Sequence, residues 1–131
     1  MKQEEKQLLL KDLCARLPFH KTICKIGEYS DYILRGIDLS NESQPLIIEL
    51  NKEQFPAYLE HVKPYLRPMS SITEEEAAEF EILSDKLLME ADNTKIWNSV
   101  VDWLDAHHFD HRGLIPMGLA LEATEEMYKE E

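Results

Sequence analysis

The chain has 131 residues, with 14 basic and 26 acidic side chains and a formal net charge of −12. This length fits a single domain over residues 1–131, and a hydrophobic content of 44% excludes a disordered chain. The acidic balance disfavours direct binding to nucleic acid, which requires a basic patch. No run of apolar residues exceeds three, and the N-terminus lacks the apolar block of a signal peptide. We therefore expect a cytoplasmic protein without membrane contact.

The excess negative charge lies entirely in the second half of the chain. Residues 1–69 contain ten basic and ten acidic side chains and are neutral. Residues 70–131 contain four basic and sixteen acidic side chains, which accounts for the whole net charge. The two cysteines, Cys14 and Cys24, cannot form a disulfide framework, and we expect both to be small buried hydrophobic residues in a reducing compartment.

The first half predicts a helix followed by a three-stranded antiparallel meander. Residues 2–17 predict a helix that ends at Pro18. Its apolar side chains recur at helical spacing and are Leu10, Leu13, Cys14 and Leu17. Residues 20–39 predict a hairpin around a type II′ turn at Gly27-Glu28. In this hairpin the alternating faces are His20, Thr22, Cys24 and Ile26 on one strand and Ile33, Arg35, Ile37 and Leu39 on the next. After the polar loop 40–45, residues 46–50 predict the third strand.

Residues 51–63 predict a short helix whose start is ambiguous, because either Asn51 could cap it or Pro56 could occupy its first turn. The two prolines of residues 63–68 exclude a regular helix there. We expect this segment to be an extended connector between the neutral and acidic halves.

The second half predicts an antiparallel helix pair that packs together and on the sheet. Thr73 and Glu76 have the spacing of a capping box, and the buried stripe of the first helix is Phe80, Leu83, Leu87 and Ala91. After 92–94, a second helix runs to about residue 108 and carries a broad apolar face made of Ile96, Trp97, Val100, Val101, Trp103 and Leu104. Gly113 closes this region, residues 118–123 could add an edge strand, and residues 124–131 form an acidic tail.

Three of the five histidines lie in residues 107–111, and they are the only candidates for a metal site. If the helix continued, His107 and His111 would lie one turn apart on one face, with His108 and Asp110 nearby. Gly113 predicts instead that the helix is ending, where a histidine also complements the helix dipole without a metal. We therefore favour a structural role over metal binding. The pair Asp102 and Asp105 is expected from the density of acidic residues alone, so it does not predict acid–base catalysis.

Two groups of residues are candidates for protein interaction. Glu74, Glu75 and Glu79 lie in the acidic block 73–92, which is either a solvated face or a mimic of nucleic-acid charge that blocks a basic protein. Tyr65, Leu66 and Arg67 are side chains typical of interaction hot spots, although packing between the two halves explains them equally.

Residues 62–76, VKPYLRPMSSITEEE, and residues 102–115, DWLDAHHFDHRGLI, resemble an uncharacterised family of small proteins from gut bacteria and their phages or prophages. The resemblance covers the second half of the chain closely and the N-terminal hairpin loosely. It implies no activity, cofactor or catalytic residue. It implies that the position of His111 is often tyrosine, so that a metal site using His111 is not the family's shared purpose.

Together these features predict an α+β fold and a non-enzymatic interaction or accessory protein of a phage or mobile element, which binds a host protein, a phage protein or itself. No cofactor is expected. One alternative is an acidic inhibitor of a nucleic-acid-binding protein. A second alternative is a small metal-dependent enzyme built on the corner His107–His111.

Overall fold

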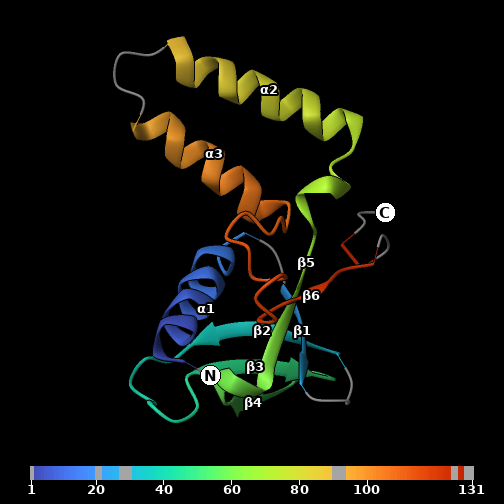
Figure 1. Cartoon of the computed structure of the whole chain (residues 1–131). Helices are drawn as coiled ribbons and strands as arrows, with labels where there is room; N and C mark the ends of the chain where they lie inside the picture. The colour runs from blue at the N-terminus through green and yellow to red at the C-terminus, as the bar shows by residue number, and fades with distance from the viewer. Residues whose placement is uncertain (1, 20–21, 27–30, 90–93, 125–126, 129–131) are drawn as a thin grey trace.

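The computed structural model describes residues 2–19, 22–26, 31–89, 94–124 and 127–128, with the backbone alone at 87–89 and 94–97. The fold is α+β, with three helices and a six-stranded mixed sheet of order β4-β3-β2-β1-β5-β6. Figure 1 shows α1 packed beside the strands and the pair α2–α3 extending away from them. None of the described helices is both long and apolar enough to cross a membrane.

Helix α1, Gln3–Arg16, confirms the predicted N-terminal helix, but its buried face is rotated by one residue. The fully buried positions are Leu9, Asp12, Leu13 and Arg16, which keep the helical spacing i, i+3, i+4, i+7. Two of these four residues are charged, which is why an apolar stripe could not reveal them. Cys14 is exposed, so its predicted burial is wrong, whereas Cys24 is buried as expected.

Strands β1, Thr22–Ile26, and β2, Asp31–Ile37, confirm the hairpin, and its predicted turn lies outside the described residues. The prediction that Ile33 and Ile37 share one face of β2 is wrong, because Leu34 enters the core and Ile33 lies on the opposite face. A bulge between Leu34 and Gly36 shifts the register by one residue, so that Ile37 also packs against the core. The predicted third strand is β3, Leu46–Leu50.

The predicted helix 51–63 is wrong, because Asn51 and Lys52 form a two-residue turn into β4, Glu53–Ala57. Both turn residues have positive φ, 53° and 69°, as a type I′ hairpin requires. Pro56 lies in edge strand β4, opposite Ile47. This pair is a non-hydrogen-bonded pair of the antiparallel ladder, so the N–H that proline lacks would point away from β3. The proline therefore removes no hydrogen bond between the two strands. The antiparallel meander therefore has four strands rather than three.

The predicted connector is extended but is not free, because most of it forms strand β5, Val62–Leu66, after a 3₁₀ turn at Leu59–His61. Strand β5 pairs antiparallel with β1 on one side and parallel with β6, Leu121–Glu122, on the other. Strand β6 confirms the predicted edge strand within 118–123.

Helices α2, Glu74–Met89, and α3, Thr94–Ala106, confirm the helix pair and its capping box. The Thr73 N–H donates to Glu76 Oε1 at 3.0 Å and the Glu76 N–H donates to Thr73 Oγ1 at 3.2 Å. The predicted packing of this pair on the sheet is wrong. Its apolar faces form a separate cluster of Val100, Leu104 and Phe109 with Ile72, Phe80, Leu83 and Trp103. The remaining predicted core side chains, Leu87, Ala91, Ile96 and Trp97, lie outside the described side chains.

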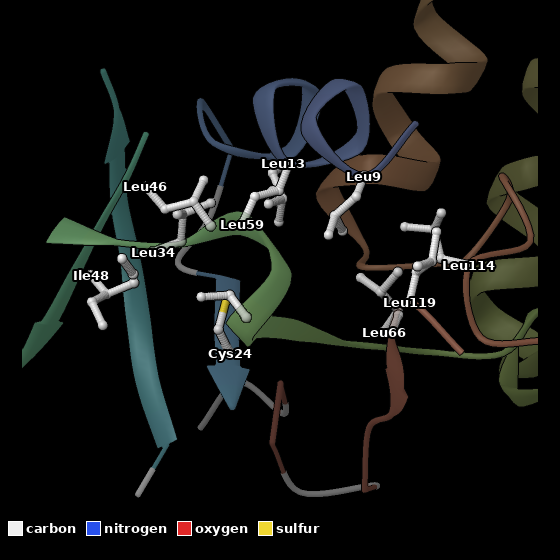
Figure 2. Close-up of a cluster of buried hydrophobic side chains, with 13 residues drawn as sticks. Leu9, Leu13, Cys24, Leu34, Leu46, Ile48, Leu59, Leu66, Leu114 and Leu119 are labelled. Atoms are coloured by element: carbon white, nitrogen blue, oxygen red, sulfur yellow. The ribbon is translucent and has the colours of Figure 1, made fainter. Parts of the chain in front are cut away.

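The main core lies between the sheet, α1 and the segment 114–120 (Figure 2). Its fully buried members come from α1, β1, β3, β5 and the segment 114–120, and are Leu9, Leu13, Cys24, Leu46, Val62, Leu66 and Leu114. Among the described side chains, α1 and residues 114–120 pack on this face of the sheet, and none of α2 or α3 belongs to this core.

Candidate functional site

Helix α3 ends at Ala106 in a Schellman motif, which decides where the histidines lie. The His108 N–H donates to Asp105 O at 3.1 Å, and the Phe109 N–H donates to Leu104 O at 3.0 Å. His108 occupies the left-handed position usually taken by glycine, with φ of 65°. Phe109 is fully buried against Leu104, the apolar contact that accompanies this motif.

The three histidines of this corner have separate partners. The His107 Nδ1–H donates to Trp103 O at 2.8 Å, and the His107 ring stacks on Trp103 at 4.1 Å between centroids. The His108 ring stacks on Tyr128 at 3.6 Å. Among the described residues no group of three or more His, Cys, Asp or Glu side chains is placed to hold a metal ion. The helical spacing that suggested a metal site is therefore not realised, because the helix ends before His111.

His111 belongs instead to a buried charge cluster that joins α1 to the end of α3. Its Nε2–H donates to Asp105 Oδ1 at 2.8 Å, and Arg112 Nη1 donates to Asp105 Oδ1 at 2.9 Å and to Asp12 Oδ1 at 2.7 Å. Arg16 Nε donates to Asp12 Oδ2 at 2.8 Å. The cluster thus pairs two carboxylates with two guanidinium groups, and the side chains of Asp12, Arg16 and Asp105 are at most 1% exposed.

The electrostatics of this cluster favour charged groups. Burial raises the pKa of Asp105, but hydrogen bonds from His111 and Arg112 and the charges of Arg112 and Arg16 outweigh it and lower that pKa to about 2. Burial lowers the pKa of Arg112, yet its bonds to Asp105 and Asp12 raise it above its ordinary value. The two carboxylates and the two guanidinium groups neutralise one another, and no nucleophile lies among them. The cluster therefore has the character of a structural ion network rather than an active site.

The other residues of the segment 102–115 also have structural roles. Asp110 accepts hydrogen bonds from the N–H groups of Leu114 at 2.7 Å and Ile115 at 2.9 Å. A second Schellman turn follows, in which the Leu119 N–H donates to Leu114 O and Gly118 takes φ of 77°. Sequence reasoning missed Asp12, Arg16 and Arg112. The only available signal was a pair of opposite charges one helical turn apart in α1.

Arg67 connects the sheet to the helix pair. Its guanidinium makes a two-pronged bond to Glu76, with both N···O distances at 2.7 Å, and lies 4.3 Å from the centre of the Phe109 ring. This bond to Arg67 lowers the pKa of Glu76 to about 2 despite the opposing effect of burial, with help from the Thr73 N–H. The Arg67 main chain adds bonds to His108 O and the Asp110 N–H. Arg67 is thus committed to an internal contact.

The other candidates in this segment have different environments. Leu66 is fully buried in the main core and cannot contact a partner. Tyr65 is half-buried, and its side chain lies on the face of the sheet opposite to Leu66. Its main-chain oxygen accepts a hydrogen bond from Tyr128 Oη at 2.8 Å, and Tyr128 Oη also accepts the Ile23 N–H at 2.8 Å. Part of the predicted acidic tail is therefore anchored between β1 and β5.

The outward face of α2 carries several exposed acidic side chains, Glu74, Glu75, Glu81 and Asp85. The exposed Lys86 and Ile82, which is 59% exposed, lie on the same helix. Glu79, by contrast, accepts a hydrogen bond from Trp103 Nε1 at 3.2 Å and so links α2 to α3. The interaction candidates Glu74 and Glu75 therefore face solvent, whereas Glu79 also supports the helix pair.

One groove of about 300 Å³ lies between α1 and the loop 39–45. Its floor includes Leu10, Leu39 and Leu59, and Lys6 pairs with Glu60 across it at 2.7 Å. Its lining includes the carboxylates of Glu42 and Glu60 and the hydroxyl of Ser43, but no histidine or cysteine.

Comparison with known proteins finds no matching family model, no similar curated protein and no similar solved structure, so the site's geometry alone carries the assignment of function.

Proposed function

We propose that this chain is a non-enzymatic interaction protein whose α2–α3 helix pair docks a basic surface of a partner protein. The observation that carries this proposal is the position of the pair: it extends away from the sheet and has its own small core (Figure 1). No described side chain of either helix belongs to the main core. A projecting helix pair that is not needed to close the main core is free to present its outer face to another molecule.

The charge of this outer face selects the kind of partner. Residues 73–106 carry ten acidic and two basic side chains. Glu76 and Asp105 are neutralised internally by Arg67 and Arg112. The other acidic residues that the structure describes in this segment are exposed: Glu74, Glu75, Glu79, Glu81, Asp85 and Asp102. The exposed Ile82 adds an apolar side chain beside these charges. Such a surface steers a basic partner toward it and offers one hydrophobic anchor for the bound state.

Charge reversal of the outer face tests the proposal. The variant Glu74→Lys, Glu75→Lys, Glu81→Lys avoids Glu79, whose bond to Trp103 supports the helix pair. Its matched control reverses exposed charges on the other half of the molecule, Glu42→Lys and Glu53→Lys. We expect affinity capture from a bacterial lysate, with and without nuclease, to recover a basic protein with the wild type and the control. The outer-face variant should lose it by about tenfold or more, because electrostatic steering and affinity both decrease.

Capture that is equal for all three proteins would refute the docking face. Capture that disappears on nuclease treatment would show a nucleic-acid bridge rather than a protein contact.

An inhibitor that mimics nucleic acid is a more specific form of the same proposal. It is favoured by the row of carboxylates along one helix face, which can occupy the phosphate-binding groups of a basic groove. In this form, duplex DNA competes with the chain for the captured protein. A partner that binds DNA and the chain simultaneously contradicts it.

The proposed setting is a phage or other mobile element, and it rests on the resemblance of residues 62–76 and 102–115. In the structure these strings form β5, the Arg67 contact to Glu76, and the turn that carries Asp110 and Arg112. A gene neighbourhood without phage or mobile-element genes would contradict this setting without affecting the docking face.

A further inference from the structure

The ladder between β1 and β5 lacks one hydrogen bond that its register allows. Its pairs end at Cys24–Pro64, and the same register places Ile23 opposite Tyr65. Hydrogen-bonded and non-hydrogen-bonded pairs alternate along an antiparallel ladder, and a proline has no N–H to donate. The pair Cys24–Pro64 is therefore non-hydrogen-bonded, so that the Ile23 N–H and the Tyr65 oxygen face each other at the next position. A direct bond between them would extend the ladder by one pair.

The Tyr128 hydroxyl occupies the position of this bond. Tyr128 Oη accepts the Ile23 N–H at 2.8 Å and donates to Tyr65 O at 2.8 Å, and it also lies 3.4 Å from Ile23 O. An oxygen atom that binds both groups keeps them farther apart than the about 2.9 Å of a direct N–H···O bond. The hydroxyl thus replaces one backbone hydrogen bond of the ladder with two bonds to a side chain.

The ring of Tyr128 makes a second contact, at the end of α3. It stacks on His108 with 3.6 Å between the ring centres and 11° between the ring planes. His108 belongs to the Schellman motif that ends α3, so Tyr128 contacts β1, β5 and the base of the helix pair at once. Burial raises the pKa of the Tyr128 hydroxyl, which therefore keeps the proton that it donates to Tyr65 O.

We infer that Tyr128 is a removable latch between the sheet and the helix pair. A hydrogen-bonded side chain is costly to remove when it leaves buried backbone groups without partners. Here the two freed groups face each other, so the Ile23 N–H can donate directly to Tyr65 O once the hydroxyl has left. The fold therefore has two hydrogen-bonded arrangements at this position, one closed through Tyr128 and one with the ladder extended by a pair.

The closed arrangement keeps the stack on His108 and the burial of the Tyr128 ring, and it is the one that the structure contains. The open arrangement removes one of the contacts that fix the end of α3 to the rest of the molecule. The latch thus regulates how firmly the helix pair is held, whatever the pair binds, so this inference does not depend on the proposed docking function.

Two substitutions of Tyr128 separate the two arrangements. Tyr128→Phe removes the hydroxyl and keeps the ring on His108, so the Ile23 amide loses its acceptor while the ring still prevents the direct bond. Its hydrogen exchange should become about tenfold faster. Tyr128→Ala removes both the hydroxyl and the ring, so the direct bond forms. Although this change is larger, exchange of the Ile23 amide should return to within about threefold of the wild type.

Nuclear magnetic resonance identifies the new bond directly. Scalar coupling between an amide nitrogen and a carbonyl carbon across a hydrogen bond arises only when the N–H donates to that carbonyl. We expect coupling from Ile23 to Tyr65 in Tyr128→Ala and none in the wild type or in Tyr128→Phe. The ring-current shift of His108 should persist in Tyr128→Phe and disappear in Tyr128→Ala. Met127→Ala is the matched control, since it retains the hydroxyl and should behave like the wild type.

Coupling between Ile23 and Tyr65 in the wild type would overturn the inference, because the hydroxyl would then not replace the direct bond. Fast exchange without coupling in Tyr128→Ala would overturn it as well, because the ladder would not close. If Tyr128→Ala does not fold, Tyr128→Ser repeats the test with a small side chain that suits exposure to water. Unfolding of both variants would show that Tyr128 is required for the fold and is not a removable latch.

Discussion

Neutralising Asp105 tests whether the buried charge cluster holds α1 to the end of α3. The substitution Asp105→Asn keeps the side chain's shape but leaves the guanidinium groups of Arg16 and Arg112 with Asp12 as their single buried carboxylate. The ordinary pKa of 3.8 falls to about 2 in the folded protein, which corresponds to about 2.5 kcal/mol in favour of the charged form. Breaking a buried ion pair by removing one partner costs about 3–5 kcal/mol. We therefore expect a loss of about 3 kcal/mol in the free energy of unfolding at pH 7.

Urea denaturation monitored by far-ultraviolet circular dichroism measures this loss. The matched control is Asp102→Asn, an exposed carboxylate on the same helix, which should change the free energy of unfolding by less than about 0.5 kcal/mol. The double variant Asp105→Asn, Arg112→Met should be less destabilised than the sum of its single variants, because it removes both members of one pair. A loss below about 1 kcal/mol for Asp105→Asn would refute the reasoning, since the cluster would then not be coupled to folding.

The same pair of pKa values predicts how stability depends on pH. Because the folded pKa of Asp105 lies below its unfolded value, its contribution is present above about pH 4 and is lost as pH falls from about 4 to about 2. The lowered pKa of Glu76 adds to this acid-sensitive range in the same direction. The wild type should therefore lose stability more steeply in this range than Asp105→Asn does. Parallel acid titrations of the two proteins would contradict the assignment.

Three further substitutions test local features of the fold. Tyr128→Phe removes the hydroxyl that accepts the Ile23 N–H, and should cost about 1–3 kcal/mol and speed hydrogen exchange of that amide; unchanged exchange would contradict the anchor. Lys52→Gly relieves a positive φ in the β3–β4 turn and should raise the free energy of unfolding by about 0.5–1 kcal/mol, whereas a helix at this position would be destabilised. Thr73→Ala removes the helix cap and should cost about 1 kcal/mol, with the loss seen as faster exchange at the start of α2.

Elements that depend on interactions between residues close together in the chain were predictable from the sequence. The capping box at Thr73 and Glu76 needs only two side chains three residues apart, and both of its hydrogen bonds are present. Strands β1, β2 and β3 follow from alternation between turn residues, and α1 follows from its helical period and Pro18. His107 and His111 do not share one helix face, because a Schellman motif with histidine, not glycine, at the left-handed position ends the helix before His111.

Elements that depend on contacts with residues far away in the chain were not predictable from the sequence. Residues 51–57 read as a helix because Pro56 suits a helix start as well as a strand edge, and only pairing with β3 makes it an edge. The charged residues Asp12 and Arg16 lie in the interior of the molecule because partners distant in the sequence complete their ion network. Arg112, 100 residues from Asp12, pairs with that carboxylate, and Asp105 lies 3.8 Å from Arg16. No local pattern contains those partners.

The sequence by itself determined the α+β class, the acidic helix pair and its caps, since period, turn chemistry and charge act over a few residues. Tertiary structure alone decided which face of each element is buried, because a long-range partner can stabilise a charge or an edge strand that local patterning disfavours. The same contacts placed His111 in a buried ion network and left the acidic side chains on the outer face of α2 exposed.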